Sequence, residues 1–149
     1  MGRPAAVGRT ELARRAGLAV VFLWFAVGGV AHFVATDAFV AIVPPWVPAP
    51  RAAVLASGAL ELAGAAGLLF PPTRRAAGIG LLLLTVAVTP ANVYMLQRAE
   101  LFERVPYWAL VARLPLQLAL LALIAWSTRA FSRSSPPRSR GTRRPSGTA

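Results

Sequence analysis

Four long apolar stretches, separated by short polar segments, constrain this chain more than any other feature of its sequence. They cover about residues 16–35, 52–70, 76–96 and 105–127. A helix of about 20 apolar residues is about 30 Å long, the thickness of the hydrocarbon core of a bilayer. Only 14% of the 149 residues are charged, too few to cover a soluble domain with polar side chains. We therefore predict an all-α fold, a transmembrane four-helix bundle over residues 16–127.

The segments around these stretches are polar or rich in helix breakers. We expect residues 36–51, which contain four prolines, to exclude regular helix, and residues 70–75 to form a tight hairpin. Residues 1–15 are predicted to be a basic N-terminal segment. Residues 128–149 consist mostly of Ser, Arg, Pro, Gly and Thr with little to bury, so we predict a disordered basic C-terminal tail.

The sixteen basic residues are all arginines, and their positions predict the orientation of the helices. Twelve lie in the N-terminal segment, the hairpin and the tail, on one side of the predicted membrane. Three lie on the other side, at Arg51, Arg98 and Arg104. The positive-inside rule then puts both termini in the cytoplasm, in agreement with an even number of spans. This distribution argues against specific nucleic-acid binding, and we expect the tail to contact anionic lipids. A secretory signal peptide is the alternative interpretation of the first stretch.

A few polar side chains interrupt the apolar stretches, and their spacing of three, four or seven residues puts those of one stretch on one helix face. Counting along the helices places nearly all of them, Thr85 excepted, in the membrane half away from the termini. Ionisable groups near the bilayer centre cost at least about 2.5–3.5 kcal/mol, so they should face the bundle interior. We therefore predict a polar pocket or hydrogen-bond network that opens toward the non-cytoplasmic face. Its candidate residues are His32, Ser57, Glu61, Asn92, Arg113 and Gln117.

Within this set, Glu61 and Arg113 are the predicted ion pair, and Ser57 and Gln117 are expected to fill its spare hydrogen bonds. The pair has two open interpretations: a buried contact that fixes helix register, or a site for a ligand or proton. His32 has the same two interpretations, a hydrogen-bonded structural residue or a ligand and proton relay.

Two prolines within the apolar stretches predict bends in the helices. Pro90 and Pro115 each remove a backbone hydrogen bond and predict kinks beside the polar side chains, either to widen the bundle or to bend it for packing. The proline-rich segment 43–50 is expected to cap the outer mouth, with Trp46 at the headgroup level. Small residues predict close helix approaches in three stretches. They include Gly28, Gly29, Gly58, Gly64, Gly67, Gly78 and Gly80.

The chain offers no familiar set of catalytic residues. It has no cysteine and a single histidine, and the sequence contains no Ser-His-Asp order, paired carboxylates, phosphate loop or metal-ligand cluster. We therefore predict no catalytic residues and no metal site.

Several short motifs occur in an order and spacing that can be compared with a known family. They are GVAHF at 29–33, IVPPWVP at 42–48, SGALE at 57–61, RRAA at 74–77, PAN at 90–92, RLPLQ at 113–117 and the single Trp126. With these motifs, residues 16–127 resemble the DoxX-like family of small four-span bacterial membrane proteins. The resemblance implies a four-helix bundle in the bacterial plasma (inner) membrane.

The resemblance does not imply one reaction. Relatives include a subunit linked to thiosulfate:quinone oxidoreduction, partners of redox or detoxification complexes, and assembly chaperones, and some branches use cysteines that this chain lacks. We expect a non-catalytic accessory or anchor subunit of a membrane complex, with a redox enzyme as partner. The alternative is a binder of a small lipophilic or quinone-like ligand in the polar pocket, quinone being the one cofactor considered. A small transporter is the weaker alternative, because the four spans show no internal repeat.

Overall fold

A computed structural model describes residues 4–130, and the side chains of residues 8–130. Residues 1–3 and 131–149, and with them nearly all of the predicted tail, lie outside the described residues. The described chain is helical, with no strand between residues 4 and 130. Its elements are α1 (Pro4–Val34), α2 (Thr36–Val40), α3 (Pro50–Leu69), α4 (Arg74–Ala87), α5 (Thr89–Gln97), the 3₁₀ helix η1 (Ala99–Leu101) and α6 (Tyr107–Thr128).

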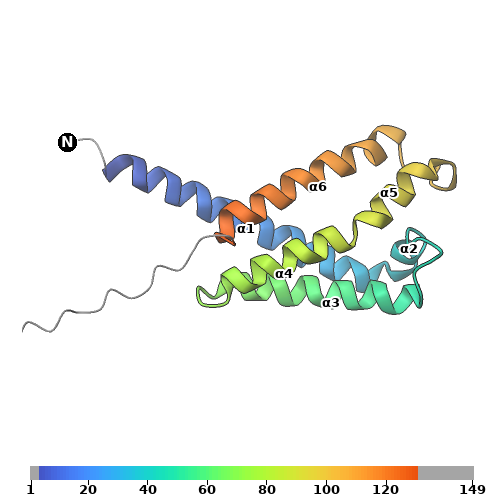
Figure 1. The fold of residues 1–149 in the computed structure, drawn as a ribbon, viewed down its shortest axis with the longest axis horizontal. Coiled ribbons are helices and arrows are strands. Elements are labelled where there is room, and N and C mark those ends of the chain that lie inside the picture. Colours follow the sequence, from blue (N-terminus) through green and yellow to red (C-terminus); the bar gives the residue numbers. More distant parts are fainter. Residues whose placement is uncertain (1–3, 131–149) are drawn as a thin grey trace, which may run out of the picture.

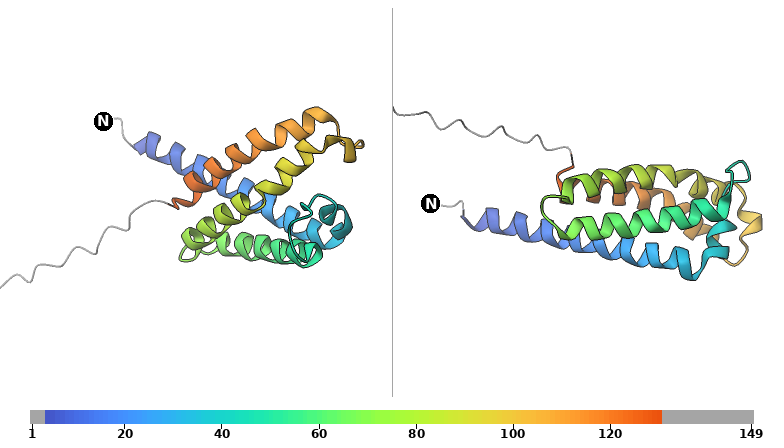
Figure 2. Two further views of the ribbon diagram at one scale, coloured as in Figure 1. Left: turned by 45° about the vertical axis from the view of Figure 1, so that its right-hand side comes forward. Right: turned by 90° about the horizontal axis from the view of Figure 1, so that it is seen from below.

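The four long helical segments form a ring. Helix α1 packs against α3 and α6, and α4 also packs against α3 and α6, while α5 continues α4 along α6. Residues 4–18, the turn at 70–73 and the C-terminal end of α6 lie at one end of the ring, here called the terminal end (Figure 1). Helix α2, residues 41–49 and η1 lie at the opposite loop end. Helices α1 and α6 cross near the terminal end and diverge toward the loop end (Figures 1 and 2).

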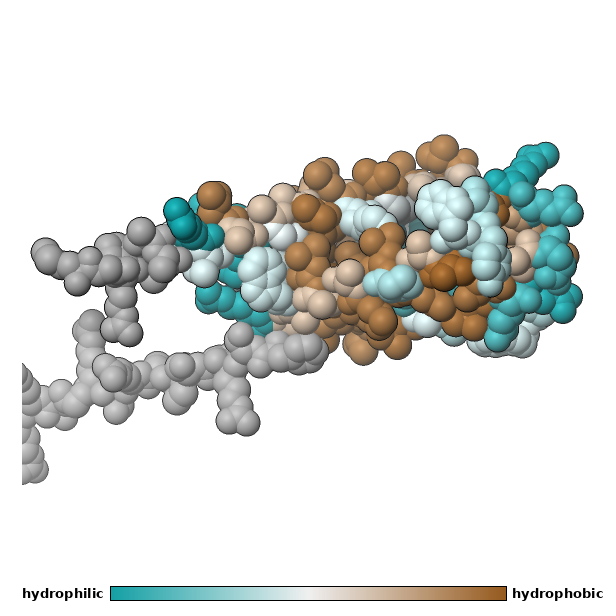
Figure 3. Space-filling model, turned by 90° about the horizontal axis from the view of Figure 1, so that it is seen from above, coloured by the Kyte–Doolittle hydropathy of each residue, from teal (hydrophilic) through white to brown (hydrophobic). Residues whose placement is uncertain are grey.

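An apolar belt surrounds the middle of this bundle. Within residues 8–130, four segments are long and apolar enough to cross a membrane: Gly8–Val34, Pro50–Leu69, Arg74–Gln97 and Tyr107–Thr128. Their outward side chains include exposed Leu23, Val27 and Leu118. Hydrophilic residues gather at both ends of the belt (Figure 3). Such a surface suits lipid rather than water, so the chain has the build of a multi-pass membrane protein.

The tightly packed core occupies the terminal half of the bundle. Helix α6 contributes Ile124, which is fully buried, and α4 contributes Leu81. The other buried members of the cluster are Leu18, Val21 and Phe25 of α1 and Ala65 and Leu68 of α3. The apolar half expected from the sequence is therefore where the buried apolar cluster lies.

Glycines set the closest helix approaches. A Cβ added to Gly58 of α3 would lie 2.6 Å from Cβ of His32 and 3.1 Å from the carbonyl oxygen of Gly29, so α1 and α3 touch almost backbone to backbone. Leu81 fills the space beside Gly64, and Thr128 packs against Gly78. The prediction is wrong for Gly80, because a Cβ there would have no atom within 4 Å.

Arginines at the terminal end also stabilise the helix ends. Arg74 Nε donates to the carbonyl of Leu68 at 2.9 Å, near the end of α3. Arg75 Nε donates to the carbonyl of Ala130 at 3.0 Å, just after α6. Carbonyl groups at a helix C-terminus lack helical donors, so a cation there offsets both the missing bond and the helix dipole.

Several predicted boundaries are wrong. Helix α1 begins at Pro4, because Glu11 pairs with Arg14 and Arg15 one turn later and supports helix in the segment predicted to precede the first span. Residues 36–40 are helical as α2, since the prolines of that segment begin only at Pro44. Helix α6 ends at Thr128, one residue after the predicted end of the fourth span, but Ala130, predicted to belong to the tail, is buried.

The glycine contacts predict different outcomes for two alanine substitutions. Gly58→Ala should lower the free energy of unfolding by about 1–3 kcal/mol, because the new methyl group meets His32 and the Gly29 backbone. Gly80→Ala should leave stability unchanged or raise it by up to about 1 kcal/mol, since alanine favours helix and the site is open. Equilibrium unfolding of both variants in detergent checks this, and equal losses would contradict the described packing.

Candidate functional site

The loop half of the bundle is hollow. Two adjoining cavities of about 490 and 450 Å³ share the lining residues Glu61, Leu84, Val88, Asn92 and Arg113. The first lies against α1 and α6, and the second lies beneath residues 42–47. We call the two together the loop-end cavity. All six predicted site residues line it: His32, Ser57, Glu61, Asn92, Arg113 and Gln117. These six residues therefore surround one space, although some of their contacts differ from those expected.

A helix break supports one wall of the loop-end cavity. The third predicted span is divided into α4 and α5 at Val88, two residues before Pro90, which has no N–H to donate. Pro90 therefore marks a real interruption. Pro115 is different, because α6 continues through it and its side chain is exposed.

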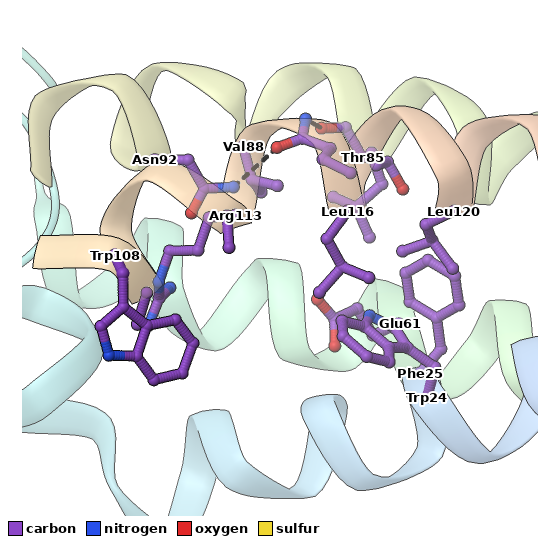
Figure 4. A pocket seen from close by; sticks show the side chains of 14 residues that line it. Trp24, Phe25, Glu61, Thr85, Val88, Asn92, Trp108, Arg113, Leu116 and Leu120 are labelled. Carbon is purple, nitrogen blue, oxygen red and sulfur yellow. Dashed lines mark hydrogen bonds between the residues drawn. The ribbon is translucent and has the colours of Figure 1, made fainter. Parts of the chain in front are cut away.

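The amide of Gln117 holds this break against α6. Its Nε2 donates to the carbonyl of Thr85 at 2.8 Å and to Thr89 Oγ1 at 2.5 Å. Its Oε1 accepts a bond of 2.6 Å from Asn92 Nδ2, which Figure 4 marks with a dashed line. Gln117 therefore bonds to the segment around the helix break, and the predicted bonds of Gln117 to the Glu61–Arg113 pair are not found among the described residues. The sequence did not predict that Thr85 and Thr89 accept hydrogen bonds from Gln117. Their spacing of seven and three residues from Asn92, which puts all three on one helix face, is a signal that could have indicated it.

The carboxyl group of Glu61 lies in the centre of the bundle without a hydrogen-bond donor from residues 8–130. It packs over Gly28, whose added Cβ would lie 2.7 Å from Oε2. Its nearest basic atom is Nδ1 of His32 at 3.9 Å, too far for a hydrogen bond. Every fully buried polar side-chain atom in the described part of the chain has a partner, so the carboxyl oxygens must be reached from the cavity.

His32 is fixed by its own helix and by α2. Its Nδ1 lies 2.8 Å from the carbonyl oxygen of Gly28, which can only accept, so Nδ1 carries the proton and donates. The ring stacks on Phe39 with centroids 4.0 Å apart. In the neutral ring Nε2 is then an acceptor, and His32 lines the second cavity.

The guanidinium of Arg113 lies where three cavities meet. Besides the two described above, Arg113 lines a third space of about 620 Å³, bordered by α2 and residues 100–105. No carboxylate among the described residues comes within 4.0 Å of it, and no hydrogen bond to it is found in the same part of the chain. Figure 4 shows Arg113 extending away from Glu61. The predicted Glu61–Arg113 ion pair is therefore wrong.

Ser57 and the proline-rich segment occupy the remaining wall. Ser57 Oγ donates to the carbonyl of Val54 at 2.8 Å, within its own helix, so it does not complete a bond to Glu61 as expected. Residues 42–44, 46 and 47 line the second cavity, and Trp46 among them is exposed. The position of Trp46 at the headgroup level stays a prediction.

The Gln117 network predicts a measurable loss of stability. Gln117→Leu leaves the Asn92 amide and the Thr85 carbonyl without this partner, and should cost about 1–3 kcal/mol of unfolding free energy. Gln97→Leu, at the exposed end of α5, is the matched control and should cost under about 0.5 kcal/mol. Thermal unfolding of both variants in one detergent compares the losses. An unfolding free energy of Gln117→Leu equal to that of the wild type would argue against the network.

Comparison with known proteins gives a family without an assigned activity. No curated protein and no solved structure matches the chain. A family model described as a domain of unknown function (DUF8561) matches residues 18–130, which contain the first candidate span from Leu18 onward and the other three in full. The chain therefore belongs to the DUF8561 family.

Proposed function

We propose that this protein binds a small amphipathic molecule in the loop-end cavity. The proposal rests on Glu61 and Arg113, which both face this cavity and have no hydrogen-bond partner within residues 8–130. The ion-pair contact found for either of them in these residues is the 3.9 Å approach of His32 Nδ1 to Glu61 Oε2. Glu61 and Arg113 come from two helices that lie across the ring from each other.

The surrounding lipid makes an unpaired ionisable side chain energetically costly. Ionisable side chains within a span cost several kcal/mol unless they are paired or hydrated. Two such side chains could pair with each other, yet here they face a common space instead. A bound molecule, or water in its absence, supplies the missing contacts. The volumes fall within the range of about 300–1,000 Å³ typical of small-molecule sites.

The lining defines the chemistry of the ligand. The guanidinium of Arg113 donates hydrogen bonds to an anion or carbonyl oxygen of the ligand. The carboxylate of Glu61 accepts a hydrogen bond from a donor on the ligand, and the protonated carboxyl group can donate one. The body of the molecule lies against apolar side chains, including Phe25, Leu84 and Leu120. A lipophilic or quinone-like molecule has this combination. The protein acts as a binder with no chemistry of its own, in line with its resemblance to DoxX-like proteins.

We also propose an orientation in the bacterial plasma membrane. Arg9, Arg14 and Arg15 lie at the terminal end together with the 74–75 pair and Arg129, whereas the loop end carries Arg51, Arg98 and Arg104. The positive-inside rule then puts the terminal end in the cytoplasm and the cavity in the outer half of the membrane. A reporter fused after Ala149 should read cytoplasmic, and a periplasmic reading would overturn this orientation.

A second candidate function is that of an accessory subunit. A lateral groove of about 470 Å³ runs between α3 and α4, and Gly80 on it has open space above it. A helix of a partner protein would fit there, as small residues allow close approach between helices. Gly80→Leu would fill the groove and release a stoichiometric partner, while leaving a molecule bound in the loop-end cavity in place. Retention of every partner by this variant would count against the accessory function.

Neutral variants of the two unpaired residues test the binding function. Glu61→Gln and Arg113→Gln should each reduce the amount of copurifying small molecule about tenfold, since each removes a charge-assisted contact. Both should keep the unfolding temperature of the wild type within a few degrees, because neither residue contributes a bond to the described fold. Solvent extraction of protein purified from native membrane, followed by mass spectrometry, measures the ligand.

Matched controls use charged residues on the loop end that do not line the first two cavities. Arg98→Gln and Glu100→Gln disrupt an exposed pair of 3.1 Å and should leave bound material unchanged. If Glu61→Gln and Arg113→Gln retain the wild-type amount of ligand, or if no ligand copurifies with the wild type, the proposal fails. If they unfold instead, the two residues stabilise the bundle directly.

A further inference from the structure

The first cavity opens sideways between α1 and α6. The two helices meet only toward the terminal end, where Gly17 packs against Leu123 and Trp126. From there they diverge toward the loop end (Figure 1). In the divergent part the cavity is lined by Trp24 of α1 and by Leu116 of α6, with about half of each side chain exposed. Because these exposed residues belong to the apolar belt, the opening faces the bilayer rather than water.

The rim of this lateral opening is apolar. Trp24 and Leu116 border it, Trp108 lies toward the loop end, and Leu120 lies toward the terminal end beside Phe25 (Figure 4). Ala112 lies on the same wall of α6 and leaves space where a larger side chain would project. A hydrocarbon chain could therefore pass from lipid into the cavity without losing apolar contact.

The third cavity, at the loop end, has a different rim. Glu100, Glu103 and Arg104 line it, and all three are exposed. Hydrocarbon placed between these charged side chains would strip water from them, which is unfavourable. Arg113 lines both this space and the lateral cavity, so a head group can rest on Arg113 while its chain extends sideways.

We propose that the ligand is an amphiphile of the bilayer with an anionic head, and that it enters between α1 and α6. Its head contacts the guanidinium of Arg113, and its chain lies in the lateral opening beside Trp24 and Leu116. A hydrogen-bond donor on the head meets the carboxyl group of Glu61, for which residues 8–130 supply none. Phosphoglycerol heads combine an anion with hydroxyl donors in this way. The inference rests on the proposed binding function of the loop-end cavity.

Photo-crosslinking in nanodiscs tests both the head and the route. The probe is phosphatidylglycerol with a diazirine in one acyl chain, diluted into phosphatidylcholine, and the readout is the labelled peptide. Wild type should be labelled on the peptides that contain Trp24 and Leu116. Arg113→Gln should reduce this labelling about tenfold. A diazirine phosphatidylcholine at the same dilution should label these peptides no more than the rest of the apolar belt.

Two tryptophan substitutions on α6 test whether the lipid enters through the opening between α1 and α6, separately from whether its head binds Arg113. Ala112→Trp fills the lateral opening and should reduce the labelling about as much as Arg113→Gln. Ala119→Trp is the matched control, on the same helix at an exposed position that lines neither cavity, and should label like the wild type. Unfolding temperatures measured alongside exclude variants that have lost the fold.

The outcomes distinguish this inference from the binding function. Equal labelling of Ala112→Trp and Ala119→Trp would overturn lateral entry, while loss of copurifying ligand in Arg113→Gln would still support the cavity. Competition by millimolar glycerol phosphate in water would show a free anion as the ligand and overturn the lipid assignment. Unchanged labelling in Arg113→Gln would overturn the role of its guanidinium in head binding.

Discussion

A bilayer supplies no hydrogen-bond partners, so each polar group on a spanning helix needs one inside the protein or on a bound molecule. Most of the polar side chains meet this constraint with partners inside the protein. Thr85 donates to the carbonyl of Leu81, Ser57 to that of Val54, and Gln117 satisfies the helix break before Pro90. Glu61 and Arg113 are the described spanning residues whose charged ends face a cavity without such a partner. They therefore carry the functional argument.

The two halves of the bundle differ because different residues set the helix spacing. In the terminal half, glycines meet large side chains, as Gly64 meets Leu81, and arginines bind helix C-terminal carbonyls, as Arg74 does. In the loop half, α1 and α3 still touch at Gly29 and Gly58, whereas α1 and α6 diverge and the segment of α4 and α5 breaks at Val88. The tightly packed terminal half thus holds the helices of the loop half in place, so a ligand can displace water from the loop-end cavity without unfolding the bundle.

The fold was largely predictable because length and apolar content are properties of single segments. The residues of the loop-end cavity were also predictable, since helical spacing and depth follow from counting along a chain. Their partners were not predictable in the same way. Whether Glu61 meets Arg113 depends on helix rotation and crossing, and these are set by contacts such as that of Gly28 with the Glu61 carboxyl group. The helical structure of residues 4–15 is supported by ion pairs between neighbouring turns, such as that of Glu11 with Arg14. The search for apolar stretches does not consider such pairs.

A bound molecule, and not a protein side chain, is proposed to satisfy Arg113 and Glu61. A high-resolution density map of the protein purified in native lipid would reveal such a molecule. We expect non-protein density against the Arg113 guanidinium that continues between α1 and α6. A loop-end cavity closed by direct contact between Glu61 and Arg113, with no density other than protein, would contradict it.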